Sequence, residues 1–258
     1  MANKGKYYES QFEEATIELL RESHWQYTFG DDIHRKYTDP LIEEDLRTFL
    51  AAQYKDKKLT ASEVDGIVAN LRNTGGQNDY YALQNTFLLY RDGYDFTYSD
   101  GRGNPFRLQY IDFEHPDHNI FRCVNQFVME QGRENRRPDI LLFVNGIPVC
   151  IVELKNPTKQ NATIRDAHTQ ICTRYMRDIP ALLKYCALAV ISDGAKNELG
   201  TTYTPFEFFY EWKKIDNEDK AGKGLDTLRT LIRGALSPER ILEILRDYVY
   251  FPDPSKED

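Results

Sequence analysis

Long apolar runs are absent from this sequence of 258 residues. No stretch approaches the roughly 18 apolar residues that a membrane-spanning helix needs, which argues against a protein that crosses a bilayer. The first residues, MANKGKYYESQFEE, lack the apolar core and the small-residue cleavage site of a secretory signal. We therefore expect a cytoplasmic protein without a membrane partner.

Cysteine is also scarce. The four cysteines, Cys123, Cys150, Cys172 and Cys186, stand far apart without a Cys-x-x-Cys pair, and each falls in an apolar run. This spacing argues against a disulfide framework or a cysteine zinc site, and each thiol is predicted to be a small buried hydrophobe. A phosphate loop of the form GxxxxGK[ST] is missing too, so ATP binding is not predicted for these 258 residues.

The apolar content is ample for a core. Hydrophobic residues make up 41% and aromatic residues 13% of the chain, and the mean hydropathy is -0.62. These values are typical of a soluble globular protein, and the length fits one large domain or two small ones.

The net charge of -8 hides one basic segment. Residues 133–177 hold eight basic and four acidic side chains, so this segment carries +4 and the rest of the chain -12. An acidic chain is not a general nucleic-acid binder, and for the segment taken alone a mixed solvated surface is the favoured interpretation. The segment matters because it also contains the pattern that best predicts catalysis.

Hydrophobic periodicity and turn residues predict an α/β protein. The predicted helices cover residues 7–23, 40–53, 60–72, 78–91, 162–177, 225–235 and 238–249. The predicted strands cover residues 94–98, 106–113, 120–129, 138–144, 147–155, 185–192, 198–203 and 206–211. The strand–helix–strand order around 147–192 indicates an α/β core.

Particular residues mark the ends of these elements. Asp39-Pro40 is a good cap and first turn for the second helix, Thr60 with Glu63 forms a capping box for the third, and Gly93 ends the fourth. Asn156-Pro157 is expected to end the strand before it. The continuous apolar strand at 185–192 is expected in the middle of a sheet covered on both faces.

Three polar stretches are predicted to be loops or linkers. Residues 132–137, GRENRR, read as a loop, and residues 216–224 read as a charged linker. His115 to His118 includes Pro116 and has the spacing His-x-x-His, which could suggest a metal. An exposed loop is the stronger prediction for this segment.

The pattern that predicts catalysis is Pro138-Asp139, thirteen residues, and then Glu153-Leu154-Lys155. Side chains alternate along a strand, so Glu153 and Lys155 share one face. A two-residue turn at Asn145-Gly146 would put Asp139 on the opposite face. A three-residue loop with a left-handed Gly146 would pair Asp139 with Ile151 and bring both carboxylates to one face.

Two carboxylates on one face repel each other unless a cation or proton lies between them. A hard, oxygen-preferring cation such as Mg²⁺ is the natural occupant. Lys155 adds a positive charge that can orient a water or bind a phosphate oxygen. The alternative is a surface Glu–Lys pair with an aspartate at the start of a strand.

These residues resemble the PD-(D/E)xK nuclease signature. The surrounding segments resemble the N-terminal endonuclease domain of type I restriction enzyme R subunits: FGDDIHR (29–35), IDFEHPDHNIF (111–121), VNQFVMEQ (124–131), NRRPDILLFVNGIPVCIVELKNP (135–157) and IPALLKYCALAVISDG (179–194). The resemblance covers nearly the whole chain. It implies a restriction-endonuclease-like core, a central mixed β-sheet flanked by helices, with an added helical segment at about 40–92.

The resemblance also implies site residues. Asp139, Glu153 and the backbone carbonyl of Leu154 would bind Mg²⁺, and Lys155 would position or activate the attacking water. Glu14 on the first helix is expected to join them, with Glu13 as its rival. The family carries a Gln-x-x-x-Tyr pattern that holds DNA. Here Gln170 and Tyr175 are separated by one residue more.

The function implied is Mg²⁺-dependent cleavage of double-stranded DNA without sequence preference of its own, leaving 5′-phosphate and 3′-hydroxyl ends. Arg136, Arg137 and Arg174 are predicted to contact DNA phosphates. Residues 1–215 would form the endonuclease domain, and residues 216–258 the linker and helices leading to a motor domain outside these residues, which would use ATP. Methyltransferase and specificity subunits are the expected partners. The rivals are a repair nuclease on the same fold and a non-catalytic module that docks the motor to the methyltransferase.

Overall fold

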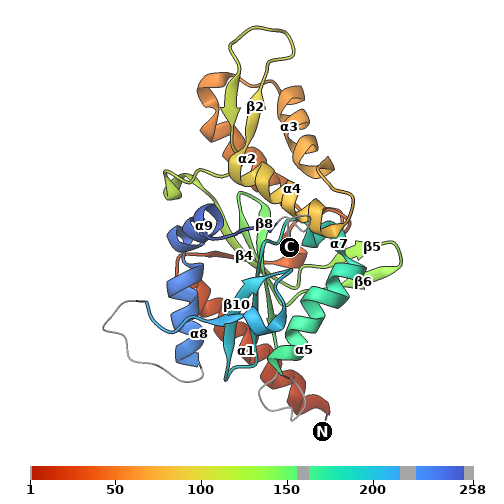
Figure 1. The fold of residues 1–258 in the computed structure, drawn as a ribbon, viewed down its shortest axis with the longest axis vertical. Helices are drawn as coiled ribbons and strands as arrows, with labels where there is room; N and C mark the ends of the chain where they lie inside the picture. The colour runs from red at the N-terminus through yellow and green to blue at the C-terminus, as the bar shows by residue number, and fades with distance from the viewer. Residues whose placement is uncertain (1, 156–162, 216–224, 253–258) are drawn as a thin grey trace.

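The computed structural model describes residues 2–155, 163–215 and 225–252, and its centre is a seven-stranded mixed sheet (Figure 1). The strand order is β1-β4-β7-β8-β9-β10-β11, with parallel pairing only between β1 and β4 and between β8 and β9. The strands are β1 (Gln26–Phe29), β4 (Phe121–Asn125), β7 (Ile140–Val144), β8 (Ile147–Leu154), β9 (Leu188–Ser192), β10 (Asn197–Thr201) and β11 (Tyr210–Glu211). The predicted α/β class with a central mixed sheet is confirmed.

Helices cover both faces of this sheet (Figure 1). One face packs against α1 (Ala2–Glu22), α8 (Leu225–Leu231) with its π-helical continuation (Ile232–Leu236), and α9 (Pro238–Asp247). The other packs against α5 (Ile164–Thr169), a π-helical turn (Gln170–Tyr175), α6 (Met176–Asp178) and α7 (Pro180–Leu183). All residues of β7, β8 and β9 are buried, as expected for strands covered on both sides.

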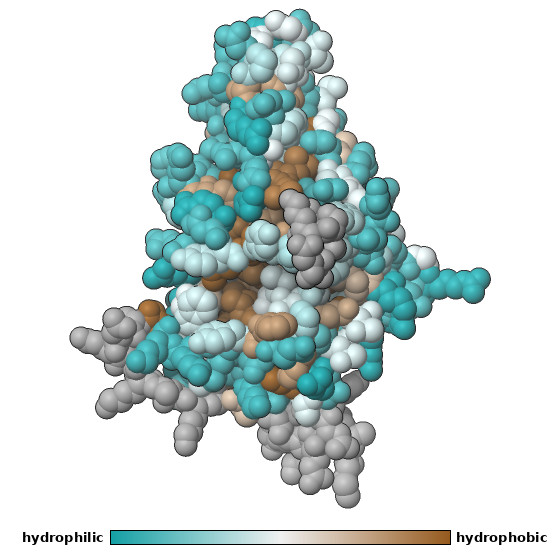
Figure 2. Space-filling view, in the orientation of Figure 1, coloured by the Kyte–Doolittle hydropathy of each residue, from teal (hydrophilic) through white to brown (hydrophobic). Residues whose placement is uncertain are grey.

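The added helical segment forms the narrow end of the molecule (Figure 1). It contains α2 (Glu43–Gln53), α3 (Ala61–Asn73) and α4 (Asp79–Asp92), followed by a separate hairpin of β2 (Tyr94–Phe96) and β3 (Phe106–Leu108). The capping box of Thr60 and Glu63 is present, and Gly93 ends α4 at φ +71°, so both predictions are confirmed. On the face shown in Figure 2 the surface of this narrow end is mostly hydrophilic.

The predicted start of α2 at Asp39-Pro40 was wrong. The helix begins at Glu43, after Ile42. The carboxylate of Asp39 instead accepts the backbone N–H of Leu41 and the guanidinium of Arg72, so it closes a turn before the helix and binds α3.

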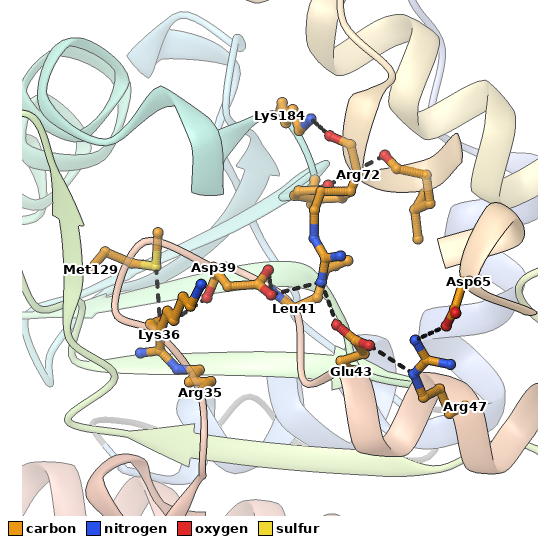
Figure 3. A network of polar contacts seen from close by, with 12 residues as sticks. Arg35, Lys36, Asp39, Leu41, Glu43, Arg47, Asp65, Arg72, Met129 and Lys184 are labelled. Atoms are coloured by element: carbon orange, nitrogen blue, oxygen red, sulfur yellow. Dashed lines mark hydrogen bonds and ion pairs between the residues drawn. The ribbon is translucent and has the colours of Figure 1, made fainter. Parts of the chain in front are cut away.

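Charged side chains join the helical segment to the sheet domain (Figure 3). Arg72 of α3 pairs with Asp39 and Glu43, and Lys184, just after α7, donates from Nζ to the backbone carbonyls of Arg72 and Thr74. A hollow of about 860 Å³ lies at this junction, lined by residues of the 34–48 segment with Arg72, Ala181, Lys184 and Tyr185. Because cations and carboxylates at its wall pair with one another, we interpret the junction as structural.

The β7–β8 hairpin differs in detail from the predicted one. Val144 pairs with Ile147, so the turn has two residues, and both Asn145 and Gly146 have positive φ, +51° and +76°. The predicted left-handed Gly146 is confirmed, but the three-residue loop was wrong. The extra residue lies on β8 beside Pro148, where the register shifts between Leu142 and Phe143. Proline has no N–H for the ladder, which favours a bulge at this position.

The turn allows a stability prediction. A Cβ on Gly146 would lie 2.1 Å from the carbonyl oxygen of Ile42, whereas Gly132, at φ +62°, has open space around it. Gly146→Ala should lower the free energy of unfolding by about 3 kcal/mol or more, while the matched control Gly132→Ala loses only the left-handed backbone cost of about 1–2 kcal/mol. Urea unfolding measures both, and equal losses would contradict the steric argument.

Several other predicted elements need correction. The polar stretch at 132–137 was predicted as a loop, but it contributes to a small hairpin of β5 (Met129–Gln131) and β6 (Glu134–Arg136) that turns at Gly132. The predicted strand at 120–129 is interrupted at Gln126, which has φ +55°. The first half of the predicted strand at 206–211 is a 3₁₀ turn (Phe206–Phe208), and only Tyr210 and Glu211 pair with β10.

The C-terminal helices pack into the sheet domain. The indole N–H of Trp25 donates to the carbonyl of Leu236, and Asn197 of β10 donates to Thr227 of α8. The predicted linker at 216–224 and the strand end at Asn156-Pro157 lie on residues outside the described ranges, and the domain boundary at 215 stays a prediction. Within the described ranges no helix has the length and apolar character to cross a membrane.

Candidate functional site

Asp139 and Glu153 meet where β7 begins and β8 ends, at the same end of two central strands. Ile140 pairs with Val152 across the β7–β8 ladder, so the same register continued by one residue puts Asp139 opposite Glu153, on the face covered by α5. The backbone N–H of Leu154 donates to the Asp139 carboxylate at 2.7 Å. The carboxylates therefore share a face, as expected, although the bulge at Pro148 and not a longer loop brings them there.

Glu153 is an unusual carboxyl group because it is almost completely buried, with an exposed fraction of 1%. Burial and, secondarily, the neighbouring charge of Asp139 raise the pKa of Glu153 to about 8, against the lowering effects of Lys155 and Tyr175. Desolvation and a like charge both disfavour the ionised form. Without a further cation, this side chain therefore holds a proton near neutral pH.

Four side chains form a closed ring of hydrogen bonds, and Glu153 is one of them. The Nζ of Lys155 donates to Glu153 Oε1 at 2.8 Å and to Gln170 Oε1 at 2.6 Å. The Gln170 amide donates to the hydroxyl of Tyr175 at 2.6 Å, and that hydroxyl donates to Glu153 Oε2 at 3.3 Å. Because each member is held by two others, the ammonium group of Lys155 has a fixed position beside the carboxyl pair.

The π-helical turn explains the spacing of Gln170 and Tyr175. An α-helix brings residues four apart onto one face, and a π-helical turn adds one residue to that repeat. The turn covers Gln170–Tyr175, so the side chains at its two ends lie on one face and bond directly. The π-helical turn therefore accommodates the one extra residue between Gln170 and Tyr175. π-Bulges of this kind occur frequently at functional sites.

The structure brings Glu13, and not the preferred Glu14, toward the sheet. Glu13 accepts from the side-chain amides of Asn125 at 2.6 Å and Gln126 at 3.1 Å, and Asn125 pairs with Ile140, the neighbour of Asp139. Glu14 is exposed on α1. The helical spacing of Phe12, Thr16 and Leu20, all buried, could have shown that residue 13 lies nearer the core than residue 14.

The predicted DNA-contacting arginines differ in their surroundings. Arg136 bonds to Asp178 at 2.7 Å and to Glu134 at 2.5 Å, so its charge is balanced within the protein. Arg137 and Arg174 are exposed, and neither has an ion pair with another described residue. Asp178, which is 4% exposed and also bonds to Arg177, was not anticipated as the partner of Arg136.

The mixed sheet, its flanking helices and the edge where β7 begins and β8 ends define a restriction-endonuclease-like α/β domain. Residues 6–208 match the family model described as type I restriction enzyme R protein N terminus, and the chain belongs to this family.

Curated relatives agree with this assignment. The chain is 31% identical, over 94% of its length, to the type I restriction enzyme HindI endonuclease subunit of Haemophilus influenzae, of which it covers 24%. It is 27% identical, over 92% of its length, to the putative type I restriction enzyme MjaIXP endonuclease subunit of Methanocaldococcus jannaschii, of which it covers 25%. The chain therefore spans about a quarter of the length of these relatives.

Proposed function

We propose that the chain cleaves double-stranded DNA in a Mg²⁺-dependent reaction without sequence preference of its own, as the endonuclease part of a type I restriction enzyme R subunit. The observation that carries this proposal is the buried Glu153 carboxyl beside Asp139, with the Lys155 ammonium 2.8 Å away. Burying a carboxyl group costs free energy unless hydrogen bonds or a cation compensate it, and Glu153 also lies beside the charge of Asp139. Perturbed groups of this kind gather at catalytic sites.

The donor set fits a hard divalent cation. Asp139 and Glu153 offer carboxylate oxygens, the Leu154 carbonyl is the third proposed ligand, and Glu13 approaches the same edge from α1. Bound Mg²⁺ would supply the positive charge that stabilises a phosphate as its bond breaks. Residues of the chain would position the reacting groups: the N–H of Leu154 orients Asp139, and Gln170 holds Lys155 where it can orient a water.

The proposed DNA surface lies beside this edge. Arg137 precedes the Pro138-Asp139 pair, and Arg174 lies on the π-helical turn between Gln170 and Tyr175. Both arginines are exposed, so both can reach phosphates, whereas Arg136 is paired with carboxylates. We therefore assign the main phosphate contacts to Arg137 and Arg174.

This assignment predicts a salt effect. Replacing Arg137 and Arg174 with alanine should weaken binding to all DNA sequences alike and reduce the slope of log K against log salt by about 0.9 for each lost phosphate contact. Arg107→Ala, the loss of one arginine charge on β3 at the narrow end, is the control for each single replacement and should leave the slope unchanged. Fluorescence anisotropy over a salt series measures both, and an unchanged slope in the double variant would remove these arginines from the DNA surface.

The remaining parts of the proposal concern the complete enzyme. Methyltransferase and specificity subunits would choose the DNA, and an ATP-driven motor elsewhere in the R subunit would move it, in the cytoplasm. Cleavage of covalently closed plasmid by the assembled enzyme should require Mg²⁺ and stop when Asp139 or Glu153 is replaced. A module that only docks the motor to the methyltransferase would instead tolerate these substitutions.

A further inference from the structure

We propose a second metal site, for Zn²⁺ or a similar divalent transition metal, formed by Asp112, His115 and His118. These residues lie in the connection between β3 and β4, and one ligand atom of each lies within 4.8 Å of the other two. The Nδ1 atoms of His115 and His118 lie 3.4 Å and 2.9 Å from the same oxygen, Asp112 Oδ2. The sequence alone favoured a plain exposed loop because the segment is polar and contains Pro116, and Asp112 was not considered as a third ligand.

The carboxylate of Asp112 is held rigidly in place. Its Oδ1 atom accepts the backbone N–H groups of Glu114 and His115, both at 3.0 Å, which fixes the plane of the group and leaves Oδ2 facing the imidazoles. The side chain is 7% exposed. A buried, oriented carboxylate with one oxygen directed at two imidazoles has the form of a prepared ligand.

The loop itself is attached to the sheet. Asn119 accepts the backbone N–H of Asp112 and donates back to its carbonyl, and Asn145 of the β7–β8 turn donates to Asn119. These bonds are 2.9, 2.7 and 2.8 Å long. The three ligand atoms therefore stand on a framework that includes the left-handed turn residue Asn145, and metal binding would not have to order the loop.

The positions of the two imidazoles suit a metal. Their rings stack with centroids 4.8 Å apart and planes 22° apart, and both Nδ1 atoms approach the same oxygen, Asp112 Oδ2. Ligand atoms at 2.0–2.2 Å from a tetrahedral Zn²⁺ lie about 3.4 Å from one another, and the two nitrogen–oxygen separations here are 3.4 Å and 2.9 Å. The histidine side chains are 59% and 49% exposed, so a fourth position is open to water.

Hydrogen bonding alone explains this arrangement less well. Gln53 of α2 donates to Asp112 Oδ2 at 3.0 Å, and the Nδ1 of His118 hydrogen-bonds to the same oxygen at 2.9 Å, so the 3.4 Å approach of His115 Nδ1 is not explained by a hydrogen bond. Such an oxygen has about two lone-pair sites. A cation held between the three ligand atoms would account for the approach of both imidazoles to Oδ2. Asp112 with two neutral imidazoles is also a ligand set typical of Zn²⁺.

This site is separate from the carboxylates proposed for Mg²⁺. Phe121, which begins β4 just after the loop, pairs with Val144 at the turn end of the β7–β8 hairpin. Glu153 lies at the other end of β8. The two sites therefore lie at opposite ends of the central strands, and a metal in one can be measured independently of the other.

The test is a Co²⁺ titration of the 258-residue chain, freed of metal and kept in excess Mg²⁺ to occupy the carboxylate site. Tetrahedral Co²⁺ absorbs visible light much more strongly than octahedral Co²⁺ in an oxygen-rich site, so the absorption reports which site fills. The wild-type chain should develop a strong visible band that saturates at one equivalent, and Zn²⁺ should abolish it by displacement.

Three variants make this test specific. His118→Ala and Asp112→Asn should each weaken Co²⁺ binding by at least about tenfold, and the asparagine keeps the Oδ1 acceptor that orders the loop. His34→Ala removes an exposed histidine elsewhere and should bind like the wild type. A wild-type chain without the band, or a His118→Ala chain with the wild-type isotherm, would overturn the proposal. Circular dichroism of Asp112→Asn excludes unfolding as the cause of its loss.

Discussion

Replacing Lys155 with alanine should lower the rate of DNA cleavage by about 100-fold or more while Mg²⁺ binding holds or tightens. The ammonium group lies 2.8 Å from Glu153 and is held there by Gln170, so its loss removes the only cation bonded to Glu153 among the described residues. Removing a positive neighbour favours binding of another cation at the carboxylates. Binding and rate therefore respond in opposite directions.

The pH of this comparison matters. Lys155 lowers the pKa of Glu153, so the alanine variant should protonate Glu153 at a higher pH than the wild type does. Calorimetric titration with Mg²⁺ should be done at about pH 9, where the Glu153 carboxyl is more fully ionised. At this pH the direct effect of Lys155 on Mg²⁺ binding is separated from its effect on the protonation of Glu153. Lys213→Ala, an exposed lysine before the undescribed 216–224 segment, is the matched control. Normal cleavage by Lys155→Ala would remove this residue from the mechanism.

The second large effect concerns stability. Without divalent metal, Glu153→Gln should raise the free energy of unfolding by roughly 3 kcal/mol at pH 7. The folded chain holds the Glu153 pKa at about 8, whereas an unfolded glutamate has an ordinary pKa of 4.5. Between these values the folded state binds the proton and the unfolded state does not. Stability from this group is thus complete below about pH 4.5 and is lost as the pH rises toward 8.

The glutamine variant removes this titration because its amide is neutral throughout. Urea unfolding between about pH 4.5 and 8 should show a steeper decline for the wild type than for Glu153→Gln. Mg²⁺ should restore stability to the wild type and not to the variant, since ligand that binds only the folded state stabilises it. Glu14→Gln, an exposed glutamate on α1, should keep the wild-type slope. Parallel pH profiles for wild type and Glu153→Gln would show that Glu153 is not held protonated.

The sequence predicts the sheet best where its signals are local. The apolar strand at 185–192 and the capping box of Thr60 and Glu63 depend on neighbouring residues, and both are found. The register of the β7–β8 hairpin was harder to predict from the sequence. Asn145 and Gly146 together form a two-residue turn, and the compensating bulge lies at Pro148, so two local features had to be combined to place Asp139 opposite Glu153.

The environment of the candidate site depends on contacts that periodicity does not contain. A π-helical turn leaves the apolar pattern of Ile164, Ala167, Ile171 and Tyr175 intact, so the sequence could not show that Gln170 meets Tyr175. The pairing of Arg136 with Asp178 and the choice of Glu13 over Glu14 depend on where α6 and α1 lie against the sheet. The three residues of the motif itself needed only strand alternation and a family resemblance.

Cleavage of covalently closed plasmid DNA by the assembled restriction enzyme tests the central claim most directly. Enzyme with Asp139→Ala or Glu153→Ala should give no linear product in Mg²⁺, and the double variant should be little worse than either, because residues that serve one metal act as a unit. ATP-driven translocation should continue in all three variants, which shows that the complex is assembled. Linear product formed at the wild-type rate by Glu153→Ala would contradict the assignment of this edge of the sheet as the nuclease site.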